Sequence, residues 1–195
     1  MVFAEKKIVL RDGRVATLKT PDIEDAQKML AYIRKASGET IFLNRYSKEW
    51  DRVTIEDEQH WIQDNRGSDN TLVIACYIDG SVVGSCQIEF KDELKASHRA
   101  VLGIAVLKEY WRLGIASAMF DELIAAAQAR PCIEIVELEF LEGNTRAQAL
   151  YEKYGFKIVG ERPNAFKLKD GRMMKEYFMQ KALERAEINP SVYNA

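Results

Sequence analysis

Apolar and polar positions alternate along several stretches of the chain, and this pattern predicts strands joined by tight turns. Two strand-like runs flank Asp12–Gly13 and two longer ones flank Asp79–Gly80, so each pair is typical of a β-hairpin. A third turn of this kind, Asp170–Gly171, lies between the last two strand-like runs. The three hairpins indicate that much of the sheet is antiparallel.

Helical spacing of apolar residues predicts four helices. The first opens at Thr20-Pro21-Asp22, and the second follows Thr54, with acidic residues in its first turn. The third covers residues 115–129, and the fourth, "NTRAQALYEKY", ends at Gly155. Between the first two, "SGETIFLNRYSKEWD" is polar and aromatic, and we expect an irregular binding loop or lid.

Strand-like runs surround the third helix: "HRAVLGIAVL" precedes it and "IEIVELEF" follows it. Because hairpins and strand–helix–strand units both occur, we predict an α/β domain with a mixed, mostly antiparallel sheet flanked by helices. A chain of 195 residues suits one domain, so residues 1–195 are expected to form it.

Composition narrows the class of protein. Charged residues make up 30% of the chain with a net charge of -2, which argues against a nucleic-acid partner. The three cysteines, Cys76, Cys86 and Cys132, lack metal-site spacing and are expected to be reduced core residues, so no metal is predicted. The start "MVFAEKKIVL" is too short and charged for a signal peptide, and no run has the length of a membrane span. We therefore expect a soluble cytoplasmic protein with no membrane partner.

The turn "WRLGIA", Trp111 to Ala116, joins a strand to a helix. A helix start offers unpaired N–H groups and a partial positive charge, and Gly114 would let a phosphate approach the backbone. Arg112 adds charge and Ser117 a hydroxyl. Read alone, a tight turn without ligand is the simpler interpretation. Neither a P-loop nor a G-x-G-x-x-G fingerprint is present, so coenzyme A is the pyrophosphate carrier to consider.

A second segment, "NTRAQALYEKYGF", matches N-x-x-A-x-x-L-Y-x-x-x-G-F at every fixed position. Asn144 and Tyr151 are seven residues apart and share one helix face, with the small Ala147 between them leaving room for a ligand. The simpler alternative for these residues is a helix cap, a core alanine and a half-buried aromatic ring.

Together the two segments resemble the GNAT superfamily of N-acetyltransferases. The acetyl-CoA motif of that family is written Q/R-x-x-G-x-G/A, and Trp111 stands where Gln or Arg is usual. The order of elements also agrees with the family from Ile8 to Met179.

The resemblance implies a fold with two parallel strands that splay apart and a site for acetyl-CoA between them. It implies that main-chain groups near Ile104, Ala105 and Val106 pair with the pantetheine arm, and that an N–H near Val106 stabilises the oxyanion. It implies that Asn144 contacts the arm and that Tyr151 is the general acid, a role suited to a group that stays protonated at neutral pH. The pyrophosphate is expected on the amides of residues Arg112, Leu113, Gly114, Ile115 and Ala116, with Trp111 stacking on the cofactor.

Four matters stay open at this stage. The base that takes the proton of the amine is Glu89, His98, Glu137, Glu139 or water, and each side chain is more simply a solvated or paired residue. The loop from Gly38 to Asp51 and the segment "RPNAFKLKDGR" are expected to frame an amine acceptor of unnamed identity. A homodimer is common in the family. The alternative function is a non-catalytic acyl-CoA-binding or regulatory module on the same fold, and a cofactor-free structural protein ranks last.

Overall fold

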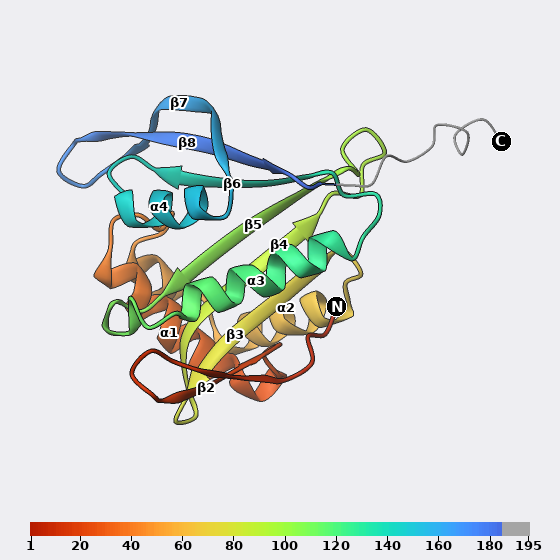
Figure 1. The fold of residues 1–195 in the computed structure, drawn as a ribbon. Coiled ribbons are helices and arrows are strands. Elements are labelled where there is room, and N and C mark those ends of the chain that lie inside the picture. The colour runs from red at the N-terminus through yellow and green to blue at the C-terminus, as the bar shows by residue number, and fades with distance from the viewer. Residues whose placement is uncertain (185–195) are drawn as a thin grey trace.

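Eight strands form one sheet in the order β1-β2-β3-β4-β5-β6-β8-β7 in the computed structural model, which describes residues 1–184 (Figure 1). All neighbours are antiparallel except β5 and β6. The predicted mixed, mostly antiparallel sheet is therefore confirmed. The strands are β1 Lys6–Val9, β2 Val15–Lys19, β3 Thr71–Ile78, β4 Ser81–Phe90, β5 Arg99–Val106, β6 Ile135–Leu141, β7 Lys157–Lys167 and β8 Met173–Ala182.

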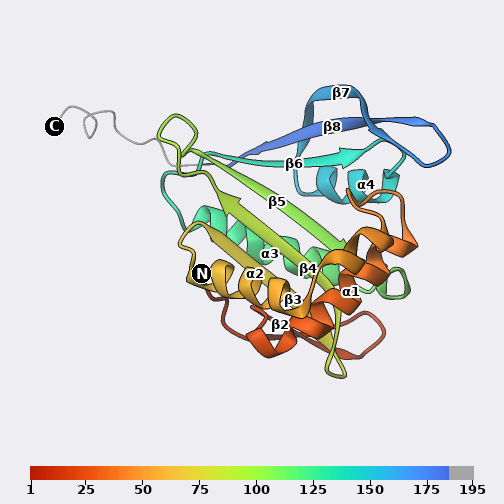
Figure 2. The same ribbon diagram turned by 180° about the vertical axis from the view of Figure 1, so that it is seen from behind.

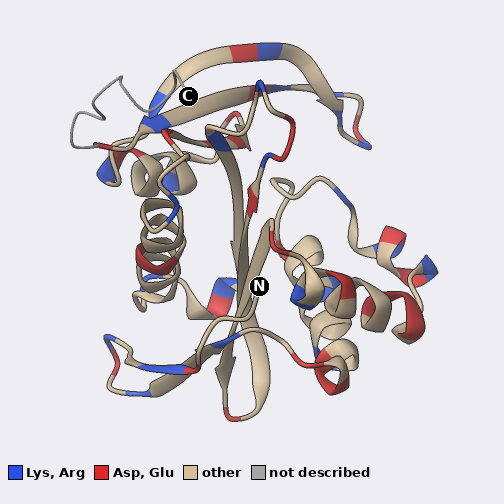
Figure 3. Cartoon of the chain, turned by 90° about the vertical axis from the view of Figure 1, so that its right-hand side faces the viewer, with Lys and Arg blue, Asp and Glu red and all other residues tan. Residues whose placement is uncertain are grey.

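Helices cover both faces of the sheet (Figures 1 and 2). They are η1 Ile23–Asp25, α1 Ala26–Glu39, η2 Ser47–Arg52, α2 Ile55–Gly67, η3 Lys108–Tyr110, α3 Ile115–Gln128 and α4 Thr145–Lys153. Viewed along the edge of the sheet, α3 and α4 lie on one side and α1 and α2 on the other (Figure 3). Each side has its own hydrophobic core, centred on Phe120 and Met119 under α3 and on Tyr32 and Ile62 under α1 and α2.

Local sequence explains most element ends. Asp79 and Gly80 have φ of 49° and 76°, the two positive values that a type I′ turn requires between β3 and β4. The side chain of Thr54 accepts a hydrogen bond from the N–H of Asp57, whose carboxylate returns one to Thr54, so α2 begins with a capping box. The three hairpins and four helices predicted from the sequence are present.

Within the described residues, one pair of strands is parallel, and it separates after a short contact. Residues Arg99–Val101 of β5 pair with Ile135–Glu137 of β6, and beyond this point β5 continues beside β4 while β6 continues beside β8. The two strands diverge visibly in Figure 1. The splay expected from the family resemblance is confirmed, and it opens the middle of the sheet.

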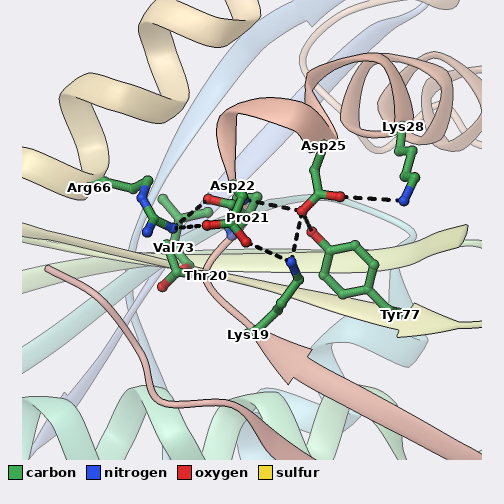
Figure 4. Close-up of polar contacts among 9 residues, drawn as sticks. All are labelled: Lys19, Thr20, Pro21, Asp22, Asp25, Lys28, Arg66, Val73 and Tyr77. Carbon is green, nitrogen blue, oxygen red and sulfur yellow. Dashed lines mark hydrogen bonds and ion pairs between the residues drawn. The ribbon is translucent and has the colours of Figure 1, made fainter. Parts of the chain in front are cut away.

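A polar network fixes the start of α1 to the sheet (Figure 4). The Asp25 carboxylate accepts a hydrogen bond of 2.8 Å from the Tyr77 hydroxyl and lies 3.0 Å from Lys19 Nζ. Asp22 pairs with Arg66 of α2 at 2.9 Å. Burial alone would raise the pKa of Asp25, but the Tyr77 hydroxyl, the Asp22 N–H and Lys19 outweigh it and hold that pKa below its usual value.

Two sequence-based expectations are wrong. The stretch from Ser37 to Asp51 is not irregular throughout, because α1 continues to Glu39 and η2 forms a second helical segment. The cause is tertiary: Ser37 is buried and its hydroxyl accepts a 3.0 Å hydrogen bond from Trp50 Nε1. Cys132 is exposed in the turn after Pro131, whereas Cys76 and Cys86 are core residues as expected.

The helices described here are too short for a membrane crossing, since α1 and α3, at 14 residues each, are the longest within residues 1–184. Over the same residues, His, Cys, Asp and Glu side chains form no group of three or more that would hold a metal ion.

Candidate active site between the splayed strands

A cavity of about 580 Å³ lies where β5 and β6 part. One side is formed by the end of β5 and the turn into α3, and another by α4. The third side comes from α1 and the segment that follows it. The two sequence motifs and the expected acceptor loop therefore meet at one place in the fold.

The turn before α3 is held in a left-handed backbone conformation at two residues. Gly114 has φ of 97° and Arg112 has φ of 65°. The N–H of Arg11, from the β1–β2 hairpin, donates a 3.1 Å hydrogen bond to the Leu113 carbonyl and fastens the turn. Leu113 packs against the hydrophobic core and is not among the described residues that line the cavity. The lining residues of the turn are Trp111, Arg112, Gly114, Ile115, Ala116 and Ser117.

Trp111 is engaged by the protein itself. Its indole Nε1 donates a 2.7 Å hydrogen bond to the Val106 carbonyl, and the guanidinium of Arg146 lies over its ring. Arg146 thus already covers one face of the indole, so the predicted stacking of Trp111 on the cofactor would use the other face.

Three guanidinium groups face the cavity near this turn: Arg11, Arg112 and Arg146. Within residues 1–184 none of the three has a carboxylate partner within ion-pair distance. Burial and the neighbouring charge of Arg112 lower the pKa of Arg146. Sequence reasoning considered only Arg112; Arg146 lies inside the quoted motif, two residues after Asn144, and Arg11 is brought in by the hairpin. An anion at this position would relieve the repulsion between these charges.

Helix α4 presents Asn144, Ala147 and Tyr151 to the cavity, as their spacing predicted. Asn144 is also the N-cap, since its side-chain oxygen accepts from the Ala147 N–H at 3.3 Å. The Tyr151 ring packs between Phe120 and Phe140, with centroids at 5.6 and 5.9 Å. Burial raises the pKa of Tyr151 to about 12, so its hydroxyl stays protonated at neutral pH.

The next tyrosine of the same helix has a different role. The Tyr154 hydroxyl lies 2.8 Å from both the Ser117 carbonyl and the Asp121 carboxylate. Its ring packs on Phe120 of α3 at 5.0 Å. Burial and the Asp121 carboxylate raise the pKa of Tyr154 to about 12. Tyr154 therefore ties α4 to α3.

Alternate residues of β5 turn their main-chain groups toward the gap. The Leu107 N–H donates to the Val83 carbonyl and the Lys91 N–H to the Arg99 carbonyl, so odd-numbered residues here face β4. Ile104 and Val106 consequently face the space left by β6. Between them, the Ala105 carbonyl accepts a 2.8 Å hydrogen bond from the Tyr32 hydroxyl of α1, a residue that sequence reasoning did not single out.

Of the four side chains considered as a base, Glu139 is the one that lines the cavity. Glu89 pairs with Lys91 at 2.6 Å, and Glu137 pairs with Arg99 at 3.2 Å. His98 precedes β5 at the end far from Val106. The buried Glu176 of β8 lies on the same face of the sheet as Glu139; burial and the charge of Glu139 raise its pKa, against the effect of Arg162.

The two segments expected to frame the acceptor do come together. The N–H of Lys169 donates a 3.0 Å hydrogen bond to the Tyr46 hydroxyl, which joins the segment after α1 to the β7–β8 hairpin. Phe42 and Trp50 line the cavity, and the guanidinium of Arg45, also in its lining, lies 4.9 Å from the centre of the Trp50 ring.

This chain is similar to known proteins. The family model of the acetyltransferase (GNAT) family matches residues 36–156. The chain is 34% identical over 107 residues to the L-amino acid N-acetyltransferase AaaT of Escherichia coli K12, a match that covers 55% of this chain and 65% of that protein. The match thus spans slightly less than two thirds of the relative's length.

Solved structures show the same fold. An acetyltransferase of the GNAT family from Streptococcus pneumoniae aligns with a TM-score of 0.80 and 25% identity, over 86% of this chain and 99% of that one. The yncA protein of Salmonella typhimurium, solved with its cofactor acetyl-CoA, aligns with a TM-score of 0.71 and 18% identity, over 89% and 97% of the two chains. The family model matches more than half of the chain, and the splayed sheet, the turn before α3 and the α4 motif are the features that the resemblance implied. The protein belongs to the GNAT acetyltransferase family.

Proposed function

We propose that the protein is an N-acetyltransferase that moves an acetyl group from acetyl-CoA to the primary amine of a small molecule or protein. The observation that carries this proposal is the single cavity in which the turn before α3, the gap-facing end of β5 and the Tyr151 hydroxyl meet. A pyrophosphate, an amide-bearing arm and a thioester each find a matching set of groups there.

The residues present suit coenzyme A. Arg11, Arg112 and Arg146 supply positive charge beside the N–H groups that begin α3, which is the donor set that a pyrophosphate needs. Main-chain groups of Ile104, facing the gap, take the place of a strand partner for the amides of the pantetheine arm, while the Val106 N–H is left for the thioester carbonyl. Asn144 and Ala147 flank the arm from α4.

The chemistry is a direct transfer. The amine nitrogen attacks the thioester carbonyl and a C–N bond forms, while the C–S bond breaks and the thiolate leaves. Tyr151 donates its proton to the sulfur, and the Val106 N–H stabilises the negative charge on the carbonyl oxygen during attack. Glu139, or water beside it, takes the proton that the amine loses.

An amino acid is the acceptor that the site suits best. Arg45 offers a guanidinium to a carboxylate, and Glu139 offers a carboxylate to the ammonium or amine of the same molecule. The name of the Escherichia coli relative, an L-amino acid N-acetyltransferase, supports this choice. A polyamine or aminoglycoside would gain nothing from Arg45.

The test is an assay of CoA release with acetyl-CoA and a panel of L-amino acids, amines and peptides. We expect turnover with at least one L-amino acid, reduced by Arg45→Gln mainly through a higher KM. Tight acetyl-CoA binding without turnover on any amine would favour the alternative, a non-catalytic acyl-CoA-binding module. No binding at millimolar acetyl-CoA would rule out both.

A further inference from the structure

Tyr32 is a buried polar side chain whose position the proposed chemistry does not yet use. It is 3% exposed, lies in the middle of α1, and its hydroxyl reaches the main chain of two strands. That hydroxyl donates to the Ala105 carbonyl at 2.8 Å and accepts from the Ser85 N–H at 3.0 Å and the Ser85 hydroxyl at 3.1 Å. Burial raises the pKa of Tyr32, so the group acts as a neutral donor.

Ser85 and Ala105 are opposite each other in the β4–β5 register, so the hydroxyl lies between two groups that would otherwise bond directly. The Tyr32 side chain thus interrupts the hydrogen-bond ladder between β4 and β5 at one residue pair. This pair lies at the mouth of the splay, where β5 has already lost β6 as a partner.

The carbonyl of Ala105 and the N–H of Val106 belong to one peptide unit. Every peptide bond in residues 1–184 is trans, so these two groups point in opposite directions. Because Tyr32 holds the carbonyl on the β4 side, the N–H is directed into the gap. A hydrogen bond to a carbonyl also polarises the N–H of the same unit and strengthens its donor character.

Two further contacts limit the freedom of this peptide. A Cβ atom on Gly84 would lie 3.2 Å from the Ala105 oxygen, so a larger residue here would press on that carbonyl. On the other side, Trp111 Nε1 holds the Val106 carbonyl at 2.7 Å. The Val106 N–H is therefore fixed by contacts from α1, from β4 and from the turn before α3.

We propose that Tyr32 is a positioning residue for the transfer: through the Ala105–Val106 peptide it orients and polarises the N–H that binds the thioester carbonyl. This inference rests on the proposed function. Without the hydroxyl, Ser85 and Ala105 are free to bond directly, which would draw the end of β5 toward β4 and turn the Val106 N–H away from the reacting oxygen.

The experiment compares native protein with Tyr32→Phe and a matched control, Tyr77→Phe. Tyr77 is buried in the same hydrophobic core, but its hydroxyl bonds Asp25 and does not line the cavity. The readouts are kcat, KM for the amine, calorimetric affinity for CoA, and the infrared carbonyl stretch of bound acetyl-CoA labelled with ¹³C. The stretch reports the hydrogen bond to the thioester oxygen directly, and a purely structural role would leave it unchanged.

In Tyr32→Phe we expect kcat to fall about tenfold or more, since a positioned donor of this kind contributes about 10²–10³-fold when removed outright. The carbonyl stretch should rise in frequency, while the affinity for CoA, which lacks the carbonyl, stays within twofold. Tyr77→Phe should lose stability but keep kcat and the stretch. A native frequency and a kcat within twofold in Tyr32→Phe would overturn the inference.

A failure of the proposed function would look different, because the native protein itself would then bind no acetyl-CoA or transfer no acetyl group. If Tyr32→Phe does not fold, 3-fluorotyrosine placed at position 32 keeps the hydroxyl and makes it a stronger donor. A lower carbonyl frequency in that variant supports the inference, and an unchanged frequency overturns it.

Discussion

The indole Nε1 of Trp111 donates a 2.7 Å hydrogen bond to the carbonyl oxygen of Val106. The first residue of the turn motif thereby holds the last residue of β5, where the strand faces the gap. The usual Gln or Arg of the family is replaced here by a side chain that anchors the strand, with Arg146 stacked on its ring.

Replacing Trp111 by Phe should therefore weaken acetyl-CoA binding, because the end of β5 that faces the gap loses its anchor. Phe keeps an aromatic ring for Arg146 to cover, though a smaller one, and loses the hydrogen bond, which corresponds to about 1 kcal/mol, or roughly a fivefold loss of affinity. Calorimetric titration measures the effect. Trp111→Arg should cost less, because its guanidinium restores a donor near Val106. Equal affinity of Trp111→Phe and the native protein would assign the indole to packing alone.

Tyr151→Phe should slow the chemical step without changing the fold. The ring keeps its contacts with Phe120 and Phe140, and only the proton donor is removed, so the single-turnover rate should fall about 10²–10⁴-fold while CoA affinity is unchanged.

Tyr154→Phe is the matched control for that experiment. It removes the contacts with Ser117 and Asp121, so it should lower the free energy of unfolding by about 1 kcal/mol and leave the rate nearly intact. A slow Tyr154→Phe beside a native-rate Tyr151→Phe would reverse the assignment of the acid.

Gly114→Val should damage the turn in two ways. A β-branched residue at φ of 97° is strained by about 1–2 kcal/mol, and its side chain would stand where a phosphate approaches. We expect more than tenfold weaker binding of acetyl-CoA by calorimetry. Gly171→Val, at φ of 88° in the β7–β8 hairpin turn, is strained in the same way outside the cavity and should lose stability but not affinity. Equal affinities of the two variants would contradict the role of the turn.

Glu58 gives a pH dependence of stability. Burial in α2 raises its pKa to about 7, above the value of about 4.3 expected in the unfolded chain. The folded state therefore binds more protons between these two values, and the free energy of unfolding falls as the pH rises from about 4.3 to 7. The loss is at most about 4 kcal/mol and is complete about one pH unit above the folded-state pKa.

Glu58→Gln should remove that fall and stabilise the protein at pH 8, as measured by urea denaturation from pH 5 to pH 8. Glu56→Gln, on the exposed side of the same helix, should keep the native pH profile. A native profile in Glu58→Gln would show that the Glu58 carboxyl does not carry the effect.

Structural features that depend only on neighbouring residues could be predicted from the sequence. The turn at Asp79–Gly80 and the cap at Thr54 follow from the conformations those residues prefer, and the helix periods of α3 and α4 follow from their apolar faces. The two separate sequence motifs were also sufficient to predict the family. The continuation of α1 through Ser37 was missed because a bond to Trp50, 13 residues away, overrides the low helix propensity of this stretch.

Contacts between distant elements could not be predicted from the sequence. Tyr32 fits the helical pattern of α1 like any core residue, and nothing local shows that its hydroxyl meets a carbonyl 73 residues away. Arg11 reaches the turn only because β1 and β2 form a hairpin beside it. Glu137 and Glu139 are two residues apart and share one face of β6, but only the point at which β5 and β6 part decides which carboxylate meets the cavity.

Because β5 and β6 pair only over a short stretch, the end of β5 is an unpaired strand edge in the middle of the sheet. Exposed edges are hazards, because unpaired main-chain groups recruit strands from other molecules. Here α1 and α4 both line the cavity beside the unpaired end of β5, so a second chain has no open approach to it. A narrow ligand that carries its own amides would fit beside this edge, as the proposed acetyl-CoA does. The same geometry that covers the edge would thus favour its ligand by shape, before any charge or catalytic group is involved.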